Sequence, residues 1–251
     1  MIDSHIHADT RPYEDFEMMK IAGITKAVTC AHDPLKMSTS DVIFDHWDRI
    51  LNNDIKRAAK NDLEMYAVLG IHPRSISKDF ERALAKLPLI LKEKDVVAVG
   101  EIGLESASEL EKEVFKKQLQ LAENLKAKVV VHTPRTNKKE ITKVITSIVE
   151  ENIDPELVII DHVDKNIIDD VFELGSMLGI TVQPLKMTPN EAIALLGEYG
   201  FDKFCLDSDI SSSPSDPLSV PKTVHQMRLN GFNEKDIEKV SNINASKFFG
   251  I

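Results

Sequence analysis

Short apolar runs alternate along the chain with longer stretches in which apolar residues recur every three or four positions. The short runs are rich in β-branched residues and indicate buried strands, whereas the longer stretches predict amphipathic helices. The predicted strands cover residues 1–5, 24–30, 65–71, 96–102, 128–132, 157–162, 180–184 and 203–208. The predicted helices cover residues 16–21, 42–59, 80–91, 110–125, 141–149, 167–178, 191–196 and 220–229. Regular alternation of this kind is typical of a parallel α/β fold.

Eight strand–helix units predict a closed (β/α)8 TIM barrel. The rival fold is an open doubly wound sheet, which needs a glycine-rich turn after its first strand to bind a nucleotide. Here the first strand ends in His5-Ile6-His7-Ala8-Asp9, which contains no glycine. Because no linker or repeat interrupts the alternation, we expect residues 1–251 to form a single barrel domain. A short helix at 234–240 and the tail 244–250 would pack against it.

Charge and composition narrow the classes of protein that fit this chain. It carries 31 Lys and Arg against 41 Asp and Glu, and the resulting net charge of −10 argues against general nucleic-acid binding. Its two cysteines, Cys30 and Cys205, cannot form a disulfide framework or a Cys-rich zinc site. The start of the chain lacks the pattern of a signal peptide, and no uncharged stretch reaches the roughly 18 residues that span a bilayer. We therefore expect a cytoplasmic protein with no membrane partner.

Residues of metal-ligating type stand at the carboxyl ends of several predicted strands. These residues are His5, His7, Glu101, His132, His162 and Asp209. Strand carboxyl ends share one face of a parallel barrel, so the six side chains should converge there. Four imidazoles with two carboxylates suit zinc, manganese or iron better than magnesium. Six groups exceed the three that one catalytic zinc uses, which favours two ions sharing a carboxylate, with Glu101 as the bridge.

Further short motifs accompany these residues in a characteristic order. They are His5-Ile6-His7, Gly70-Ile71-His72-Pro73, Gly100-Glu101-Ile102-Gly103-Leu104, Gln118-Leu119-Gln120-Leu121-Ala122, Val131-His132-Thr133, His162, Leu206-Asp207-Ser208-Asp209 and the closing segment from Asn244 to Gly250. Over nearly its whole length, the sequence resembles the TatD-like metal-dependent hydrolases, a branch of the amidohydrolase-type barrels.

The resemblance implies two divalent ions, with Zn²⁺ favoured and Mn²⁺ or Mg²⁺ as alternatives. It implies that His5, His7, Glu101 and Asp209 hold one ion, and that Glu101, His132 and His162 hold the other. Asp209, and not Asp207, takes the ligand position, and Asp209 would also act as the general base toward the attacking water. Glu101 and Asp209 are therefore the expected catalytic residues. His72 would line the pocket and touch the substrate.

Three segments depart from the family pattern and mark a divergent branch. Residues 105–107 replace the Asp-Tyr that typically follows the GEIGL motif, residues 161–164 replace HCFxG, and residues 210–214 stand where Pro-Tyr is common. The metal-ligating residues are kept, whereas the aromatic residues that face the substrate are absent.

Cationic residues after the ligand strands favour a phosphate ester as the substrate. They are Arg11, Arg74, Arg135, Lys138, Lys139, Lys165 and Lys186. Among them, we expect Arg74 and Arg135 to bind the substrate, since arginine suits bidentate phosphate recognition. Because the net charge is −10 and stacking aromatics are missing, small phosphodiesters or nucleic-acid ends fit better than tightly bound duplex DNA.

Two alternatives remain open at this point. The same pair of ions could polarise a carbonyl group, which would make the protein an amidohydrolase or a lactonase. A metal-binding protein without catalytic activity is the third hypothesis.

Overall fold

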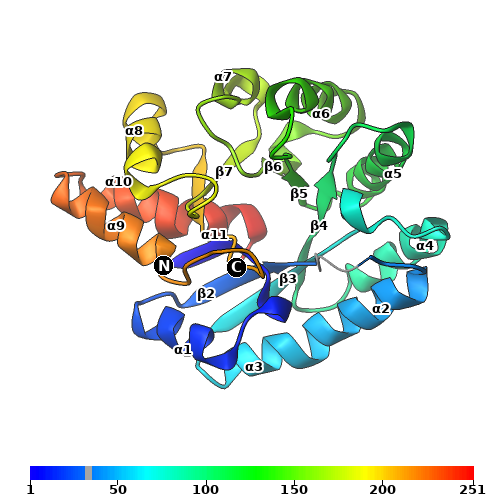
Figure 1. The fold of residues 1–251 in the computed structure, drawn as a ribbon, viewed down its shortest axis with the longest axis horizontal. Coiled ribbons are helices and arrows are strands. Elements are labelled where there is room, and N and C mark those ends of the chain that lie inside the picture. Colours follow the sequence, from blue (N-terminus) through cyan, green and yellow to red (C-terminus); the bar gives the residue numbers. More distant parts are fainter. Residues whose placement is uncertain (32–35) are drawn as a thin grey trace.

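The computed structural model describes residues 1–31 and 36–251. Eight parallel strands, hydrogen-bonded to one another in sequence order, form a barrel with helices around its outside (Figure 1). The strands are β1 (Ile2–Ile6), β2 (Lys26–Cys30), β3 (Glu64–Leu69), β4 (Val96–Gly103), β5 (Val129–His132), β6 (Val158–Ile160), β7 (Met177–Thr181) and β8 (Phe204–Asp207). The predicted TIM barrel is confirmed.

Helices connect successive strands and cover the outer face of the barrel (Figure 1). They are α1 (Tyr13–Ile21), α2 (Ser40–Arg49), α3 (Ile55–Ala59), α4 (Phe80–Ile90), α5 (Glu109–Leu125), α6 (Lys138–Asn152), α7 (Ile168–Val171), α8 (Pro189–Tyr199), α9 (Ser219–Leu229), α10 (Glu234–Glu238) and α11 (Asn244–Phe249). Wider π-helical segments, Ile50–Asp54 and Lys239–Ile243, join α2 to α3 and α10 to α11. Within the described residues, no helix combines the length and the apolarity needed to cross a membrane.

Alternate residues of the strands face two different apolar layers. Val129 and Val131 pack in the large outer core beneath the helices, whereas Val130 lies in a separate inner layer. Phe248 and Phe249 of α11 belong to that inner layer. So do residues near the amino ends of strands, among them Ile2, Val97 and Met177. The C-terminal helix therefore closes the amino end of the barrel, opposite the end where the strand carboxyl termini meet.

The seventh strand was predicted wrongly by three residues. The prediction placed a helix at 167–178 and a strand at 180–184, whereas α7 and a short 3₁₀ turn (Phe172–Leu174) precede a strand at Met177–Thr181. Gly175 ends the helical region in the left-handed conformation, with φ at 90°. The apolar residues after it fit both a helical and a strand period, and pairing with β6 and β8 selects the strand.

The barrel closes where β1 meets the end of β8. The backbone N–H of Asp209 donates to the His5 carbonyl at 2.9 Å, and the N–H of His7 donates to the Ile210 carbonyl at 2.8 Å. Next to these bonds, the buried Asp3 carboxylate accepts from the backbone N–H of Ser208 at 3.0 Å and from its hydroxyl at 2.6 Å. This seam fixes Asp209 beside His5 and His7.

Asn244 at the start of α11 anchors the closing helix, and this contact can be tested. Its side-chain amide donates to the carbonyl oxygens of Phe201 at 2.7 Å and Phe204 at 2.8 Å. Asn244→Ala leaves both carbonyls without this donor, so we expect the free energy of unfolding to fall by about 1–3 kcal/mol in a urea titration. Asn230→Ala removes an exposed amide at the end of α9 and should change it much less. Equal losses for the two variants would contradict the anchoring role.

Candidate metal centre

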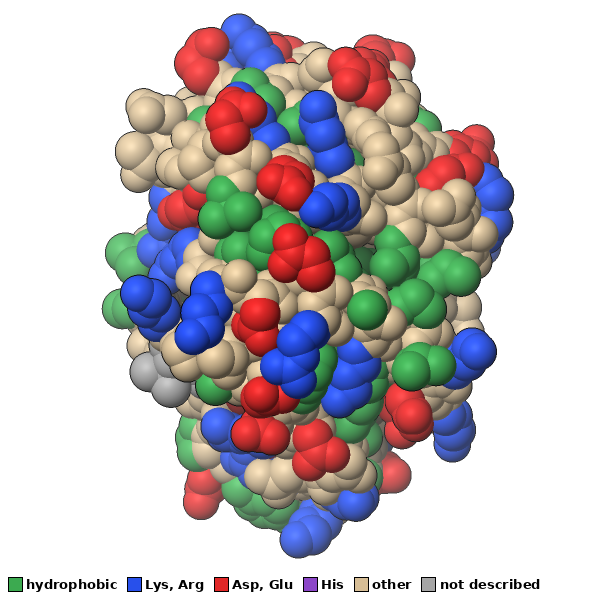
Figure 2. Space-filling view, turned by 90° about the vertical axis from the view of Figure 1, so that its right-hand side faces the viewer, with side chains coloured by type: hydrophobic (Ala, Val, Ile, Leu, Met, Phe, Trp, Pro, Cys, Tyr) green, Lys and Arg blue, Asp and Glu red, His purple; other side chains and the backbone are tan. Residues whose placement is uncertain are grey.

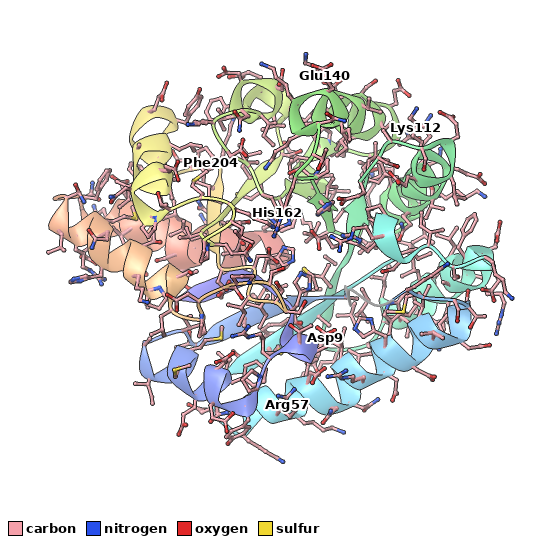
Figure 3. All side chains as sticks on the ribbon, in the orientation of Figure 1. Asp9, Arg57, Lys112, Glu140, His162 and Phe204 are labelled. Carbon is pink, nitrogen blue, oxygen red and sulfur yellow. The ribbon has the colours of Figure 1, made fainter. Side chains whose placement is uncertain are left out.

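The six residues predicted as metal ligands come together at the carboxyl end of the barrel, and all six are buried. Their donor atoms form overlapping groups, each with all atoms within 4.8 Å: His5 with His7 and Asp209, His5 with Glu101 and His162, and His132 with Glu101 and His72. Figure 3 shows His162 close to the barrel axis. Glu101 or His5 belongs to each of these groups, so the side chains form one continuous cluster.

The first part of the cluster has the donor chemistry of a divalent cation site. The Nδ1 atom of His7 donates to the Cys30 carbonyl at 3.0 Å, which leaves the Nε2 lone pair of the neutral ring facing inward. That Nε2 atom lies 3.3 Å from Nε2 of His5 and 3.1 Å from Oδ1 of Asp209. Nitrogen lone pairs and a carboxylate oxygen converge at this point, and a cation would bind all of them.

Glu101 lies between the two halves of the cluster. Its Oε1 atom is 2.9 Å from Nδ1 of His132 and 3.0 Å from Nε2 of His162. Its Oε2 atom faces the other side and lies 3.5 Å from Nε2 of His5. One oxygen on each side is the arrangement expected of a carboxylate that bridges two ions.

Two glycines allow β4 to lie close enough to its neighbours for Glu101 to reach the centre. A Cβ atom on Gly103 would lie 2.5 Å from the carbonyl oxygen of His132, and one on Gly100 would lie 2.7 Å from that of Val130. Their φ angles of 144° and 153° are ones that other residues rarely adopt. Glycine is therefore required on both sides of the Glu101–Ile102 pair.

Residues behind the cluster orient its histidines. The Asp161 carboxylate contacts Nδ1 of His5, and Thr181 Oγ1 lies 2.7 Å from Nδ1 of His162. A Cβ atom on Gly179 would lie 2.0 Å from the Asp161 carboxylate, so glycine at this position makes room for it. Such contacts fix the ring orientation and turn the Nε2 atoms of His5 and His162 toward the centre.

Burial and charge set the protonation of the cluster. Burial alone would raise the pKa of Glu101, but the His5 and His132 imidazoles hold it well below its usual range. Burial would likewise raise the pKa of Asp209, but the Lys186 ammonium and His7 keep it well below the ordinary value. Burial together with Lys186 lowers the pKa of His162 to about 4. The ionised carboxylates and the neutral His162 are in the forms that bind a metal. Against the effect of burial, neighbouring carboxylates raise the pKa of His5 and His132, so a cation would displace a proton from each of these rings.

Asp207 and Asp209 are both buried, and each belongs to a group of possible metal ligands, Asp207 with Asp161 and His162, but their electrostatic environments differ. Burial, together with the neighbouring Asp161 carboxylate, raises the pKa of Asp207 well above its usual range. Neither of its carboxylate oxygens has a hydrogen-bond partner in the described part of the chain. In contrast, Asp209 faces His7 and receives a 2.6 Å hydrogen bond from Lys186.

A cavity of about 200 Å³ opens onto the cluster. The three residues predicted to contact substrate, His72, Arg74 and Arg135, all line it. Arg11, which the sequence grouped with the cationic residues, is instead engaged by Asp15 at 2.6 Å and by the Ser211 carbonyl at 2.7 Å. Arg11 supports the loop after β8 and does not line the cavity.

Sequence reasoning missed the contacts of Glu105, Asp161 and Lys186 with the cluster. Glu105 accepts from Nε2 of His132 at 3.0 Å, and its position directly after the GEIGL motif was the available signal. Asp161 precedes His162, and strand alternation would point the two in opposite directions; the positive φ of His162, 60°, turns both inward. Lys186 was grouped with the cationic residues that follow the strands, but its 2.6 Å contact with Asp209 was not predicted.

Comparisons with known proteins agree with this architecture. A family model described as TatD related DNase matches residues 2–250. An uncharacterised metal-dependent hydrolase of Methanocaldococcus jannaschii is 40% identical over 251 residues, which cover 99% of each chain. The crystal structure of a TatD-like protein from Archaeoglobus fulgidus superposes with a TM-score of 0.87 at 29% identity, covering 100% of both chains.

A more distant structure shares the fold. The phosphotriesterase homology protein of Escherichia coli, solved with phosphate in its active site, superposes with a TM-score of 0.70 at 15% identity, covering 99% of this chain and 98% of that one.

Metal analysis tests the role of the shared carboxylate. We expect about two divalent ions per chain after purification without chelator, because six ligands exceed the needs of one site. Glu101→Ala should lower the occupancy of both ions, whereas His132→Ala should mainly empty one. Glu113→Ala, at an exposed position on α5, is the matched control. Inductively coupled plasma mass spectrometry gives the counts. A single ion in the wild type that survives the loss of Glu101 would disprove the bridge.

Proposed function

Because the chain belongs to the TatD related DNase family of metal-dependent hydrolases, we propose that it hydrolyses phosphate esters, and small phosphodiesters in particular. One observation carries this proposal: the cavity over the buried donor cluster is also lined by Arg74, Arg135 and Lys186. Cationic side chains around a metal centre are suited to an anionic substrate group, and arginine binds phosphate oxygens in pairs.

The proposed ligand sets are those that the sequence suggested. His5, His7, Glu101 and Asp209 would hold one ion, while Glu101, His132 and His162 would hold the second. An imidazole-rich set favours Zn²⁺, with Mn²⁺ or Mg²⁺ as alternatives. When bound, such ions polarise a phosphoryl oxygen and make water a stronger nucleophile.

Asp209 is the proposed general base. Its Oδ1 atom faces the cluster beside His7, and its Oδ2 atom accepts from Lys186 Nζ at 2.6 Å. The lysine therefore fixes one oxygen and leaves the other directed toward the centre. A carboxylate held in this way can take a proton from the attacking water.

His72, Arg74 and Arg135 are the proposed substrate contacts. Nδ1 of His72 accepts from the backbone N–H of Arg74 at 3.1 Å, so the neutral ring carries its proton on Nε2. A protonated Nε2 cannot ligate a metal but can donate to a phosphoryl oxygen. This tautomer supports substrate binding by His72, and the two arginines would bind the remaining oxygens.

The comparisons add support for a phosphate ester. The family model carries the name of a DNase, and the E. coli phosphotriesterase homology protein, which shares the fold, holds phosphate in its own active site. Both observations concern the family or a distant relative, so the substrate of this chain remains part of the proposal.

Size and charge favour small substrates over long nucleic acids. Among the described residues, no Phe, Tyr or Trp lines the 200 Å³ cavity, so these offer no platform there on which bases could stack. The chain carries a net charge of −10, and Figure 2 shows Lys and Arg interspersed with Asp and Glu on the face formed by α4 and α5. On a face where acidic and basic side chains alternate, few phosphates of a duplex can be neutralised.

Two neighbouring aspartates provide a matched test of the base. Asp209→Asn should keep the fold while lowering kcat on bis(p-nitrophenyl) phosphate by about 10²–10⁴-fold, because the amide cannot accept the proton. Asp207→Asn replaces a buried carboxyl of the same shape and should affect thermal stability more than kcat. The opposite pattern would show that the roles of the two aspartates are reversed.

A substrate panel tests the proposed function directly. With Zn²⁺, Mn²⁺ or Mg²⁺ present, we expect hydrolysis of small phosphodiesters and of terminal nucleotides in short single strands. Binding to long duplex DNA should be weak and should fall steeply as salt rises. Efficient lactone or amide hydrolysis without phosphodiesterase activity would establish the carbonyl alternative instead. Tight duplex binding at physiological salt would indicate a dedicated DNA enzyme.

A further inference from the structure

A second and larger cavity adjoins the metal centre. It lies between the segments that follow β5, β6 and β7, and its volume of about 570 Å³ falls within the roughly 300–1,000 Å³ of small-molecule sites. Arg135, His162 and Lys186 line both cavities, so the two are contiguous. The larger one extends from His162 near the barrel axis to Glu140 on α6 (Figure 3).

The walls of this cavity carry an excess of positive charge in an acidic protein. Its cationic residues are Arg135, Lys138, Lys139, Lys165 and Lys186. Its acidic residues are Glu140, Asp164 and Asp169. Lys138 is paired with Asp164 at 2.9 Å, and Lys186 is paired with Asp209. By contrast, no carboxylate in the described part of the chain forms an ion pair with Lys139 or Lys165.

The amino end of α6 adds to this positive field. Asn137 and the first residues of the helix line the cavity, and the Asn137 side chain makes no capping hydrogen bond. The first-turn N–H groups of a 15-residue helix are thus left without that side-chain acceptor, and their dipoles favour a nearby anion.

The lining also limits what kind of group can bind. Of the residues that the structure describes, no Phe, Tyr or Trp lines it, so a nucleobase would find none of these rings on which to stack. Beside Val163, Leu185 and Met187, most of the lining is polar or cationic and favours a hydrated anion, and phosphate is one that both lysine ammonium groups and helix amino termini bind.

We propose that this cavity, called here the lysine pocket, binds a second phosphoryl group of the substrate. The inference rests on the proposed function, since the first phosphoryl group would occupy the metal centre. The preferred substrate then carries two phosphoryl groups separated by a short non-aromatic spacer, with one cleaved at the metal centre and the other held by Lys139 and Lys165. The second group could belong to a small bisphosphate or to the end of a nucleic acid.

Binding to the metal-loaded protein tests the pocket without any need for turnover. The probes are straight-chain diol bisphosphates of increasing length, each compared with its monophosphate by isothermal titration calorimetry. We expect the best bisphosphate to bind on the order of tenfold more tightly than its monophosphate, as charge-assisted hydrogen bonds to one phosphoryl group would supply. In the double variant Lys139→Gln, Lys165→Gln, the two dissociation constants should converge.

Lys143→Gln is the matched control, because Lys143 lies on the same helix, pairs with Glu140 at 3.6 Å and does not line the cavity. This variant should keep the wild-type preference. A wild type that shows no preference in either the diol series or the dinucleotide pair described below, or a preference that survives in the double variant, would overturn the lysine pocket.

Kinetics separate this inference from the proposed function and identify the source of the second group. A thymidine dinucleotide with and without a terminal phosphate represents the nucleic-acid source. If the dinucleotides are cleaved but neither probe series shows a preference, the phosphoesterase proposal stands and the pocket is disproved. If bisphosphates bind preferentially but no phosphate ester is cleaved, the pocket stands and the phosphoesterase proposal fails. A preference confined to the dinucleotide pair would assign the pocket to nucleic-acid ends.

Discussion

Closure of the barrel between β1 and β8 is the constraint on which the candidate site depends. Two backbone hydrogen bonds, the Asp3 contacts with Ser208 and the bond from Ser4 Oγ to the Leu206 carbonyl hold Asp209, near one end of the chain, beside His5 and His7 at the other. Because the strands are parallel and each is followed by a segment at the same rim, every group placed at a strand carboxyl end reaches one centre. The contacts between β1 and the end of β8 therefore join the first and last strands of a sheet in which all other strands pair in sequence order.

Concentrating charge in that centre has consequences for its neighbours. Glu101 and Asp209 are buried and ionised. Moving an ionised carboxylate from water into a protein interior costs free energy unless the group is paired or binds a cation. The surrounding imidazoles and Lys186 supply part of the compensation. Asp207 lies one layer deeper without a hydrogen-bond partner among the described residues, and there burial and Asp161 favour the protonated form. Two aspartates on one segment therefore have opposite electrostatic environments.

The rim contains two kinds of side chains: those held rigidly by the strands and those carried by the helices and loops that follow them. The β-strands and the glycines around Glu101 set the metal-facing groups rigidly, since a Cβ at either glycine would collide with the β5 backbone. The segments after β5, β6 and β7 instead present lysines on helices and loops, where exchange of one side chain disturbs little packing. We infer that reaction chemistry is determined by the first set and substrate choice by the second.

The amino-acid sequence by itself determined the barrel and the identity of the converging groups. Alternating apolar periods predicted eight strand–helix units, and polar residues such as His132 and His162 ended strands whose carboxyl ends must share a face. These signals are local, so they can be read without knowing which segments touch. Only β7 was placed wrongly, because its residues satisfy two periods and pairing with β6 and β8 made the choice.

Only the tertiary structure decided how Asp161, Lys186 and Glu105 contact the predicted metal ligands. Strand periodicity places Asp161 on the inner side with Ile159 and would turn His162 outward, but the left-handed backbone at His162 turns that imidazole inward as well. Lys186 reaches Asp209 across a gap of 23 positions in the sequence, and Glu105 reaches His132 across 27. Contacts of this kind depend on backbone conformation and on the distance between loops, which no local pattern encodes.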